Sequence, residues 1–161
     1  MTLQQGDLAL LNEPLAQELL HAAIPARLAY VWSDGTPRVV PIWFQWTGEE
    51  IVMCSPPNAP KMKALTDGAK VALTIDYEAW PARVLLIRGT TTSQVIEGEV
   101  PEYAAMTDRY LGAEAAKGWR AQYAQMFPKP IRIAVTPEWV GLVDVETRFP
   151  SAIAKAIAGM Q

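Results

Sequence analysis

Residues 38–46 read RVVPIWFQW, and after a short turn residues 51–55 read IVMCS and residues 56–63 read PPNAPKMK. The first two segments are apolar and rich in β-branched and aromatic residues, which is typical of strands. Residues 47–49, Thr-Gly-Glu, form a turn short enough to pair the two strands antiparallel. The proline-rich segment then leads into a short helix, predicted over residues 60–65.

This order of elements suits a cofactor that has a phosphate at one end and a flat ring at the other. A helix N-terminus presents unpaired backbone N–H groups and a partial positive charge, which favour phosphate. Ser55, Lys61 and Lys63 lie around the predicted helix start. The preceding strand is apolar and aromatic with almost no charge, which suits a flat ring. The pattern therefore indicates a nucleotide-like cofactor, with a flavin as the first candidate.

In the rest of the chain, short turns separate most of about seven predicted strands. A helix opens at Glu13-Pro14 and ends at Pro25, a helical pair follows Val100, and a closing helix over about 151–160 starts at Ser151, the predicted cap. The predicted strands cover residues 26–32, 38–46, 50–55, 70–76, 83–96 with a bend at Gly89, 131–135 and 139–145 with Pro137 between the last two.

Strands joined by hairpin-length turns pair antiparallel, so we expect a mainly β (α+β) fold, a closed or half-closed antiparallel barrel with peripheral helices. A parallel doubly wound sheet would need more crossover helices. The near-continuous apolar character of residues 38–46 predicts a strand buried on both faces. We expect one domain over residues 1–161 with its core over about 13–145, and the first dozen residues loosely held.

The composition excludes several function classes. The net charge of −3 gives no basic field for nucleic acid. A signal-peptide pattern and a membrane-length apolar run are absent from the sequence, so we expect a cytoplasmic protein without membrane contact. One histidine, His21, and one cysteine, Cys54, are too few for a familiar zinc site or for Ser-His-Asp catalysis. We interpret His21 as a partly buried or surface side chain and Cys54 as an inert buried thiol. The chemistry is then expected to come from a cofactor.

Residues 26–46, 51–65, 71–76 and 83–89, in this order, resemble the split-barrel flavoproteins. These include the pyridoxamine 5'-phosphate oxidase-like proteins and the flavin- and deazaflavin-dependent oxidoreductases. The resemblance covers roughly residues 13–145. It implies an antiparallel split barrel that forms a homodimer and holds its cofactor at each subunit junction. The implied cofactor is FMN, with the deazaflavin coenzyme F-420 as the alternative.

The resemblance also implies which residues bind the cofactor. The hydroxyl residue that contacts phosphate in the family matches Ser55, and its basic pair falls on residues 60–61, of which only Lys61 is basic. Lys63 is the substitute for the missing partner, and Arg83 opens the strand that passes the cofactor from its far side. The family's Arg-x-Val strand, which lies along the isoalloxazine ring, matches Arg38, Val39, Val40, Pro41, Ile42 and Trp43.

Two departures from the oxidase pattern bear on the reaction. Trp43 stands where a pyridoxamine phosphate oxidase has a lysine, and there is no histidine after His21 to bind the substrate phosphate. Oxidation of pyridoxamine phosphate is therefore not expected. Instead, Trp43, Tyr77, Trp80 and Trp139 are predicted to form an apolar wall for an unidentified small-molecule substrate.

Two functions remain open at this point. The first is an oxidoreductase that moves a hydride or an electron pair through FMN or its deazaflavin relative. The second is a non-catalytic module that stores or senses a flavin or a haem. The position of His21 outside the barrel segments argues against haem.

Overall fold

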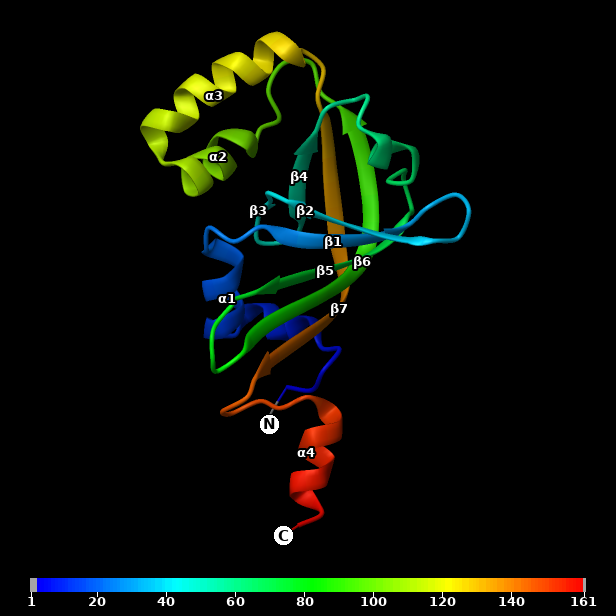
Figure 1. Ribbon diagram of the computed structural model, residues 1–161, viewed down its shortest axis with the longest axis vertical. Helices are drawn as coiled ribbons and strands as arrows, with labels where there is room; N and C mark the ends of the chain where they lie inside the picture. Colours follow the sequence, from blue (N-terminus) through cyan, green and yellow to red (C-terminus); the bar gives the residue numbers. More distant parts are fainter. Residues whose placement is uncertain (1–2, 161) are drawn as a thin grey trace.

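The computed structural model describes residues 3–160 (Figure 1). This part of the chain contains one seven-stranded antiparallel sheet, with the strand order β2-β1-β5-β6-β7-β4-β3. The elements are η1 (Leu8–Asn12), α1 (Pro14–His21), β1 (Ala26–Val31), β2 (Pro37–Ile42), β3 (Gln45–Trp46), β4 (Ile51–Ser55), η2 (Pro60–Lys63), β5 (Lys70–Asp76), β6 (Arg83–Val95), α2 (Tyr103–Leu111), α3 (Ala113–Met126), β7 (Ile131–Asp144) and α4 (Ser151–Ala158), where η is a 3₁₀-helix.

The sheet curls into a half-closed barrel because its two edge strands are close neighbours in the sequence. β2 and β3 stand at opposite ends of the strand order, yet only Trp43 and Phe44 separate them. Two linking residues reach roughly 10 Å, so the two edges must come together. Phe44 is fully buried at this junction. The predicted antiparallel split barrel with peripheral helices is thereby confirmed.

The same junction corrects one prediction. Residues 38–46 do not form one strand buried on both faces, because the chain leaves β2 after Ile42 and joins the other edge as β3. β2 is an edge strand with one neighbour, β1, and its Val39 side chain is 65% exposed. The apolar side chains of β2 are therefore partly exposed in this chain. The sequence alone does not show which strand lies at an edge or what covers it.

The N-terminal segment is also packed more tightly than predicted. Leu10 and Leu11 of η1 are buried in the barrel core together with Leu19 and Leu20 of α1. The Gly6 N–H donates to the Val140 carbonyl at 2.7 Å, which fixes the segment to β7. The expectation of loosely held residues is wrong for residues 3–12, and residues 1–2 lie outside the described part. These leucines complete the core that the sheet alone leaves open.

The long strands β6 and β7 pair over nearly their whole length. Their register shifts between Arg88 and Gly89, where Pro137 lies opposite Gly89. A Cβ atom at Gly89 would lie 2.2 Å from the Thr136 carbonyl oxygen, so only glycine fits the bend. The predicted bend is confirmed, but Pro137 does not break the last strand in two. A bulge accepts a residue without an N–H group, so β7 continues.

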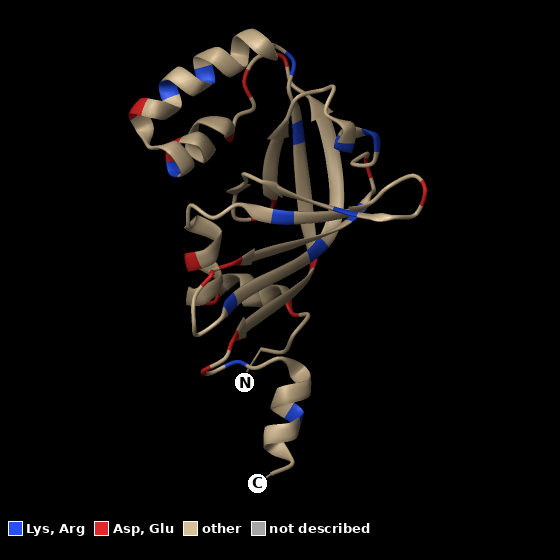
Figure 2. Cartoon of the chain, viewed as in Figure 1, with Lys and Arg blue, Asp and Glu red and all other residues tan. Residues whose placement is uncertain are grey.

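Helices occupy both ends of the barrel. The hairpin of α2 and α3 lies at one end, and α4 extends from the other (Figure 1). No side-chain cap bonds the start of α4, so the prediction that Ser151 caps this helix is wrong. Charged residues of both signs are scattered over the chain without forming one basic face (Figure 2). None of the helices within residues 3–160 combines the length and apolar character that crossing a bilayer requires.

Candidate functional site

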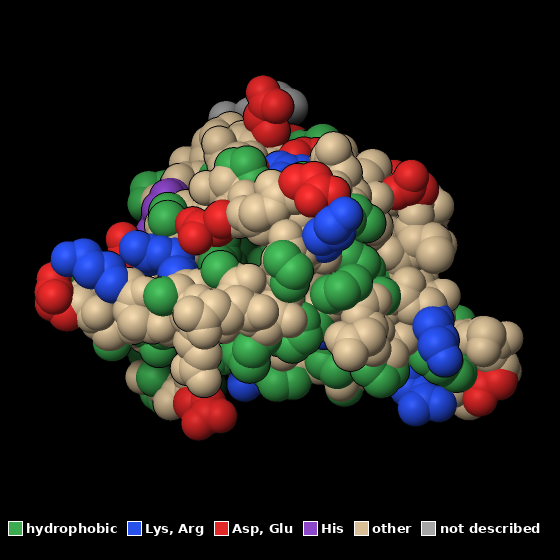
Figure 3. All heavy atoms as spheres, turned by 90° about the horizontal axis from the view of Figure 1, so that it is seen from above, with side chains coloured by type: hydrophobic (Ala, Val, Ile, Leu, Met, Phe, Trp, Pro, Cys, Tyr) green, Lys and Arg blue, Asp and Glu red, His purple; other side chains and the backbone are tan. Residues whose placement is uncertain are grey.

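A pocket of about 540 Å³ opens between the barrel and the α2–α3 hairpin. Figure 3 looks down on the end that carries this hairpin, and hydrophobic side chains gather over the middle of that end. The volume lies within the range of pockets that bind small molecules and cofactors. The lining residues are Pro25, Pro41, Ile42, Trp43, Cys54, Pro56, Tyr103, Met106, Trp119 and Tyr123.

One side of the pocket, here called the strand wall, comes from β2, β4 and the residues that follow them. Its members are Pro41, Ile42, Trp43, Cys54 and Pro56. The Trp43 indole stacks on the Tyr110 ring, with ring centroids 4.9 Å apart and an interplanar angle of 6°. Such stacking fixes the indole and adds to the apolar area that it buries. The strand wall therefore offers a rigid apolar surface of the kind predicted for a flat ring.

The opposite side, here called the helix wall, consists of Tyr103, Met106, Trp119 and Tyr123. The Trp119 Nε1–H donates to the Tyr103 hydroxyl at 2.8 Å. The Tyr103 and Tyr123 rings pack with centroids 5.0 Å apart, tilted by 42°. The sequence predicts a helical pair after Val100 but does not assign these aromatic residues to a site, because nothing local says which surface a helix face will cover.

The hydroxyl and thiol groups of the pocket stay protonated at neutral pH. Burial raises the pKa of Tyr103 to about 12 and that of Cys54 to about 11. Burial also raises the pKa of Tyr123 far above its ordinary value. The Tyr123 hydroxyl lies 3.6 Å from Cys54 Sγ, so the two groups share a weak hydrogen bond. Because the lining contains no charged side chain, the pocket is uncharged at neutral pH.

Lys61 is the residue predicted to contact the cofactor phosphate. It is half-buried on η2, and burial lowers its pKa. Lys61 follows the strand-wall residue Pro56 by five positions along the chain, but it is not among the residues that line the pocket. Within residues 3–160 no carboxylate lies within 4 Å of Lys61, whereas ten other ion pairs form. A desolvated cation without a counter-ion favours an anionic ligand. Lys63 is exposed.

Arg109 holds the helix wall against the barrel. Its guanidinium donates to the Leu20 carbonyl at 3.0 Å, to the Ala22 carbonyl at 2.8 Å and to the Phe44 carbonyl. It also lies over the Tyr110 ring, 4.7 Å from the centroid. One α2 side chain thus satisfies carbonyls at the end of α1 and at the β2–β3 junction. The role of Arg109 was not predicted from the sequence, because an arginine on a polar helix face gives no local sign that its side chain will be buried.

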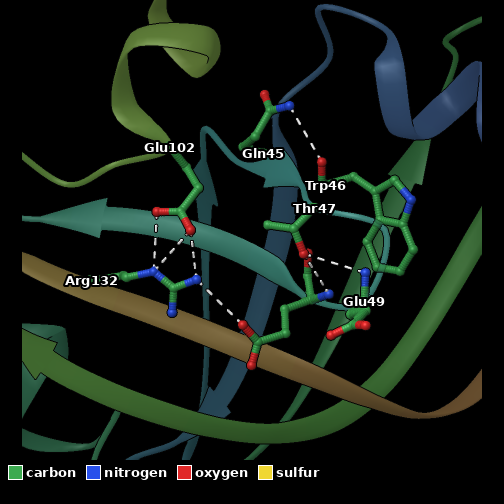
Figure 4. A network of polar contacts seen from close by, with 7 residues as sticks. Gln45, Trp46, Thr47, Glu49, Glu102 and Arg132 are labelled. Carbon is green, nitrogen blue, oxygen red and sulfur yellow. Dashed lines mark hydrogen bonds and ion pairs between the residues drawn. The ribbon is translucent and has the colours of Figure 1, made fainter.

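A second anchor joins the start of α2 to the sheet (Figure 4). Arg132 of β7 donates to both carboxylate oxygens of Glu102, at 2.6 and 3.1 Å, and pairs with Glu50 at 3.3 Å. The hydrogen bond from Arg132 is the main cause that lowers the pKa of Glu102. Both side chains of the closer pair are less than a quarter exposed, which reduces screening by water.

The structure brings only part of the predicted cofactor set together. Pro41, Ile42 and Trp43 line the pocket, whereas Lys61, on η2 shortly after the strand wall, is not among the lining residues. Ser55 is fully buried, and its hydroxyl donates to the Pro56 carbonyl at 3.2 Å, so it does not face the pocket.

The first half of the predicted ring strand faces elsewhere. The Arg38 guanidinium lies over the Trp32 ring, 5.4 Å from its centroid. Val39 lines a separate hollow of about 400 Å³ on the outer face of the sheet, with Trp139 among its other residues. Val40 packs at the edge of the barrel core. Residues 38–40 therefore do not line the pocket between the barrel and the α2–α3 hairpin.

Arg83 and most of the predicted substrate wall lie at the other end of the barrel. β6 runs 13 residues from Arg83 to Val95, which at roughly 3.3 Å per residue is roughly 40 Å. Val95 lies level with Ser55 through β7, so Arg83 is distant from the phosphate end. Tyr77 and Trp80 follow β5 near Arg83, and Trp80 is 83% exposed.

The four aromatic residues predicted to bind the substrate therefore do not form one surface within a single chain. Trp43 lies in the pocket, while the Trp139 ring lies under Arg88, 4.0 Å from its guanidinium carbon, on the outer face. The four aromatic residues were grouped by type, and residue type does not determine which end of a barrel a strand reaches. His21 is exposed, with Nδ1 2.8 Å from the Gln17 carbonyl oxygen, which agrees with its interpretation as a partly buried or surface side chain.

Comparison with known proteins agrees with this architecture. A solved F420 reductase is 25% identical with a TM-score of 0.58, covering 78% of this chain and 94% of that one. The conserved hypothetical protein Rv2991 from Mycobacterium tuberculosis is 17% identical with a TM-score of 0.63, covering 89% of each chain. HutZ, the haem storage protein from Vibrio cholerae, is 18% identical with a TM-score of 0.57, covering 82% of this chain and 93% of that one.

No curated protein sequence matches the chain. The family model described as pyridoxamine 5'-phosphate oxidase matches residues 13–144, which is most of the sequence. The match begins one residue before α1 and ends with β7, so it spans the whole barrel together with both walls of the pocket. The chain belongs to the pyridoxamine 5'-phosphate oxidase family.

Proposed function

We propose that this protein is a flavin-dependent oxidoreductase that binds FMN in the pocket and acts on a small organic molecule. The ring of the cofactor would lie along the strand wall, and its phosphate would lie near Lys61, with Lys63 as a weaker contributor. The single observation that carries the proposal is Lys61, a half-buried cation without a carboxylate partner within residues 3–160, on the 3₁₀-helix that follows the strand wall of an uncharged apolar pocket. The deazaflavin coenzyme F-420 is the alternative cofactor.

When bound, the flavin would supply the hydride or electron transfer, for which this chain has little acid–base machinery of its own. The residues of the chain would position the cofactor and keep water away from it. Trp43, fixed by Tyr110, gives the ring a rigid surface. The protonated Tyr103 and Tyr123 hydroxyls provide hydrogen-bond donors without adding charge.

We further propose that two copies of the chain pair. Val31 and Val39 are 59% and 65% exposed on the outer face of the sheet, next to the hollows that contain Trp139 and Arg88. An uncovered apolar sheet face of this kind supports isologous pairing. Pairing would also allow Arg83, Tyr77 and Trp80 of one copy to approach the pocket of the other. Light scattering should give about 35 kDa, twice the chain mass of 17.7 kDa. A mass of one chain at micromolar concentration would contradict pairing.

Titration of the cofactor-free protein with FMN and with coenzyme F-420 tests the proposed function. We expect micromolar or better affinity for one of them, followed by reduction or reoxidation of the bound cofactor with a suitable partner molecule. Absence of heat and of fluorescence quenching with both cofactors would refute the proposal. Tight binding without any turnover would instead indicate a storage or sensing module.

Oxidation of pyridoxamine phosphate should be negligible in the same assay. The pocket lining contains no cation for a second phosphate, and Trp43 occupies the place of the oxidase lysine. Turnover of pyridoxamine phosphate at a rate typical of a dedicated enzyme would show that these departures do not matter.

A further inference from the structure

The helix wall has features that a flavin on the strand wall does not require. Three aromatic rings, Tyr103, Trp119 and Tyr123, face the pocket from α2 and α3, with Met106 beside them. Trp119 remains 37% exposed although it lines the pocket, so one edge of this wall is accessible from solvent. The wall is thus an aromatic surface opposite the proposed cofactor.

We propose that the helix wall binds the substrate, and that the substrate is a flat, uncharged, ring-containing carbonyl compound whose oxygen accepts a hydrogen bond from the Tyr103 hydroxyl. This assignment rests on the proposed function, since it names the substrate class for the same pocket. The ring would lie between the two walls, with one face toward the strand wall and the cofactor.

The absence of charge in the lining disfavours an anionic substrate relative to a neutral one. An anion in this pocket would lose its hydration, and none of the ten lining residues carries a positive charge to replace it. Lys61, the half-buried cation on the 3₁₀-helix that follows the strand wall, is assigned to the cofactor phosphate. Aromatic walls favour flat rings, because offset and edge-to-face contacts add to the burial of apolar area.

The preference for a carbonyl follows from the hydrogen bonds of Tyr103. Its oxygen accepts from Trp119 Nε1–H at 2.8 Å, which fixes the position of the hydroxyl. A phenol can accept and donate at once. Within residues 3–160 no acceptor lies within hydrogen-bond distance for the Tyr103 proton, so that proton is available to a ligand. The raised pKa of Tyr103, caused first by burial, keeps the proton in place throughout the neutral range.

The alternative donor on this wall is less suitable. The Tyr123 hydroxyl lies 3.6 Å from Cys54 Sγ, so a hydrogen bond already engages it. Trp119 donates to Tyr103. Tyr103 is therefore the group expected to distinguish a ring with a carbonyl from the same ring without one.

Equilibrium dialysis of three probes against the full-length protein, with and without FMN, tests the inference. Menadione is a neutral flat ring with carbonyl groups, naphthoquinone sulfonate adds a negative charge, and naphthalene lacks the carbonyls. We expect menadione to bind about tenfold more tightly than naphthoquinone sulfonate, because the charge must be desolvated without a partner. Equal affinity for these two probes would overturn the inference.

The variant Tyr103→Phe isolates the hydrogen bond. It should weaken menadione binding about three- to tenfold, which corresponds to the loss of one neutral hydrogen bond, and leave naphthalene binding unchanged. The matched control is Tyr30→Phe, the same chemical change in the barrel core, which should affect neither probe. Equal weakening of both probes, or no weakening of menadione, would overturn the role of Tyr103.

The experiment distinguishes a failure of the substrate assignment from a failure of the proposed flavin function. If menadione shows the expected selectivity but FMN does not bind, the proposed flavin function is wrong while the ring site remains. If FMN binds and no probe selectivity appears, the substrate assignment is wrong while the cofactor proposal stands. A Tyr103→Phe protein that unfolds is recognised by circular dichroism, and the charge comparison on the wild-type protein then still decides the inference.

Discussion

The two walls of the pocket are built in different ways. The strand wall comes from residues 41–56, which follow one another along the chain. The helix wall depends on distant contacts: Arg109 reaches the Leu20 carbonyl across 89 positions, and the Tyr110 hydroxyl donates to the Ile24 carbonyl across 86 positions. If the cofactor binds as proposed, its affinity should depend mainly on the strand wall, while the stability of the pocket should depend mainly on the contacts that hold the helix wall. Substitutions should separate the two.

The variant Arg109→Ala should cause the greatest loss of stability. This change leaves three buried or half-buried carbonyls without their donor and removes two ring contacts. We expect a loss of about 3–4 kcal/mol in the free energy of unfolding, measured by urea denaturation. The control is Lys117→Ala, which removes an exposed pair with Glu114 and should change the free energy by less than about 0.5 kcal/mol. Similar losses for both variants would remove the distinction between the walls.

Lys61→Ala should act on affinity alone. A charge-assisted contact to phosphate is worth about 1.5–3 kcal/mol, so FMN affinity should fall about ten- to a hundredfold. The melting temperature without cofactor should stay within about 1 °C, since Lys61 has no ion pair among the described residues. Lys63→Ala, on the same 3₁₀-helix but exposed, is the matched control and should cost less affinity. A large drop in the melting temperature of Lys61→Ala would show that residues near the strand wall also stabilise the fold.

The variant Glu102→Gln tests the second anchor of the helix wall through the pH dependence of the free energy of unfolding. The pKa of Glu102 is lowered in the folded protein, chiefly by Arg132, so its ionised form stabilises the fold. That contribution is fully present above the ordinary glutamate pKa and is lost as pH falls through the lowered folded value. At pH 7 the variant should be less stable by about 1–2 kcal/mol. Denaturation between pH 7 and pH 3 should show the difference from wild type shrinking toward acid. A constant difference would mean that the ion pair does not contribute.

The smallest expected effect is that of Arg83→Ala. Its ion pair with Glu18 spans 3.4 Å between side chains that are 40% and 47% exposed, so stability should fall by no more than about 1 kcal/mol. Because Arg83 lies at the far end of β6, FMN affinity should change only if the arginine of a second copy reaches the cofactor. Calorimetric titration of the variant measures this. An affinity loss as large as that of Lys61→Ala would place Arg83 in the site through pairing.

Much of the fold could be predicted because its signals are local. The turn at residues 47–49 pairs the strands on either side of it, and the bend in β6 was predicted from a glycine, Gly89, in the interior of a strand. The errors share another cause. The exposure of Val39, the packing of Leu10 and the continuity of β7 through Pro137 all depend on what lies opposite a segment, which its own residues do not encode.

The candidate site divides in the same way. The phosphate contact at Lys61 and the ring surface at Trp43 were predicted from one continuous stretch. Trp43 lines the pocket, and Lys61 lies on η2, which follows the strand wall. Ser55 belongs to the same stretch, but the strand alternation turned it inward. Tyr103, Arg109 and Trp119 were absent from the predicted site, because a helix face carries no record of its partner surface.

The sequence alone was enough to predict a half-closed antiparallel barrel with an apolar, aromatic segment followed by a short helix that carries two lysines. These features follow from residue periodicity, turn chemistry and the order of elements, all of which act over a few residues. The tertiary structure decided that the α2–α3 hairpin forms the second wall, that the pocket is uncharged, and that Arg83 lies at the opposite end. Those outcomes depend on contacts between segments 30 to 89 positions apart, where packing and burial determine which groups meet.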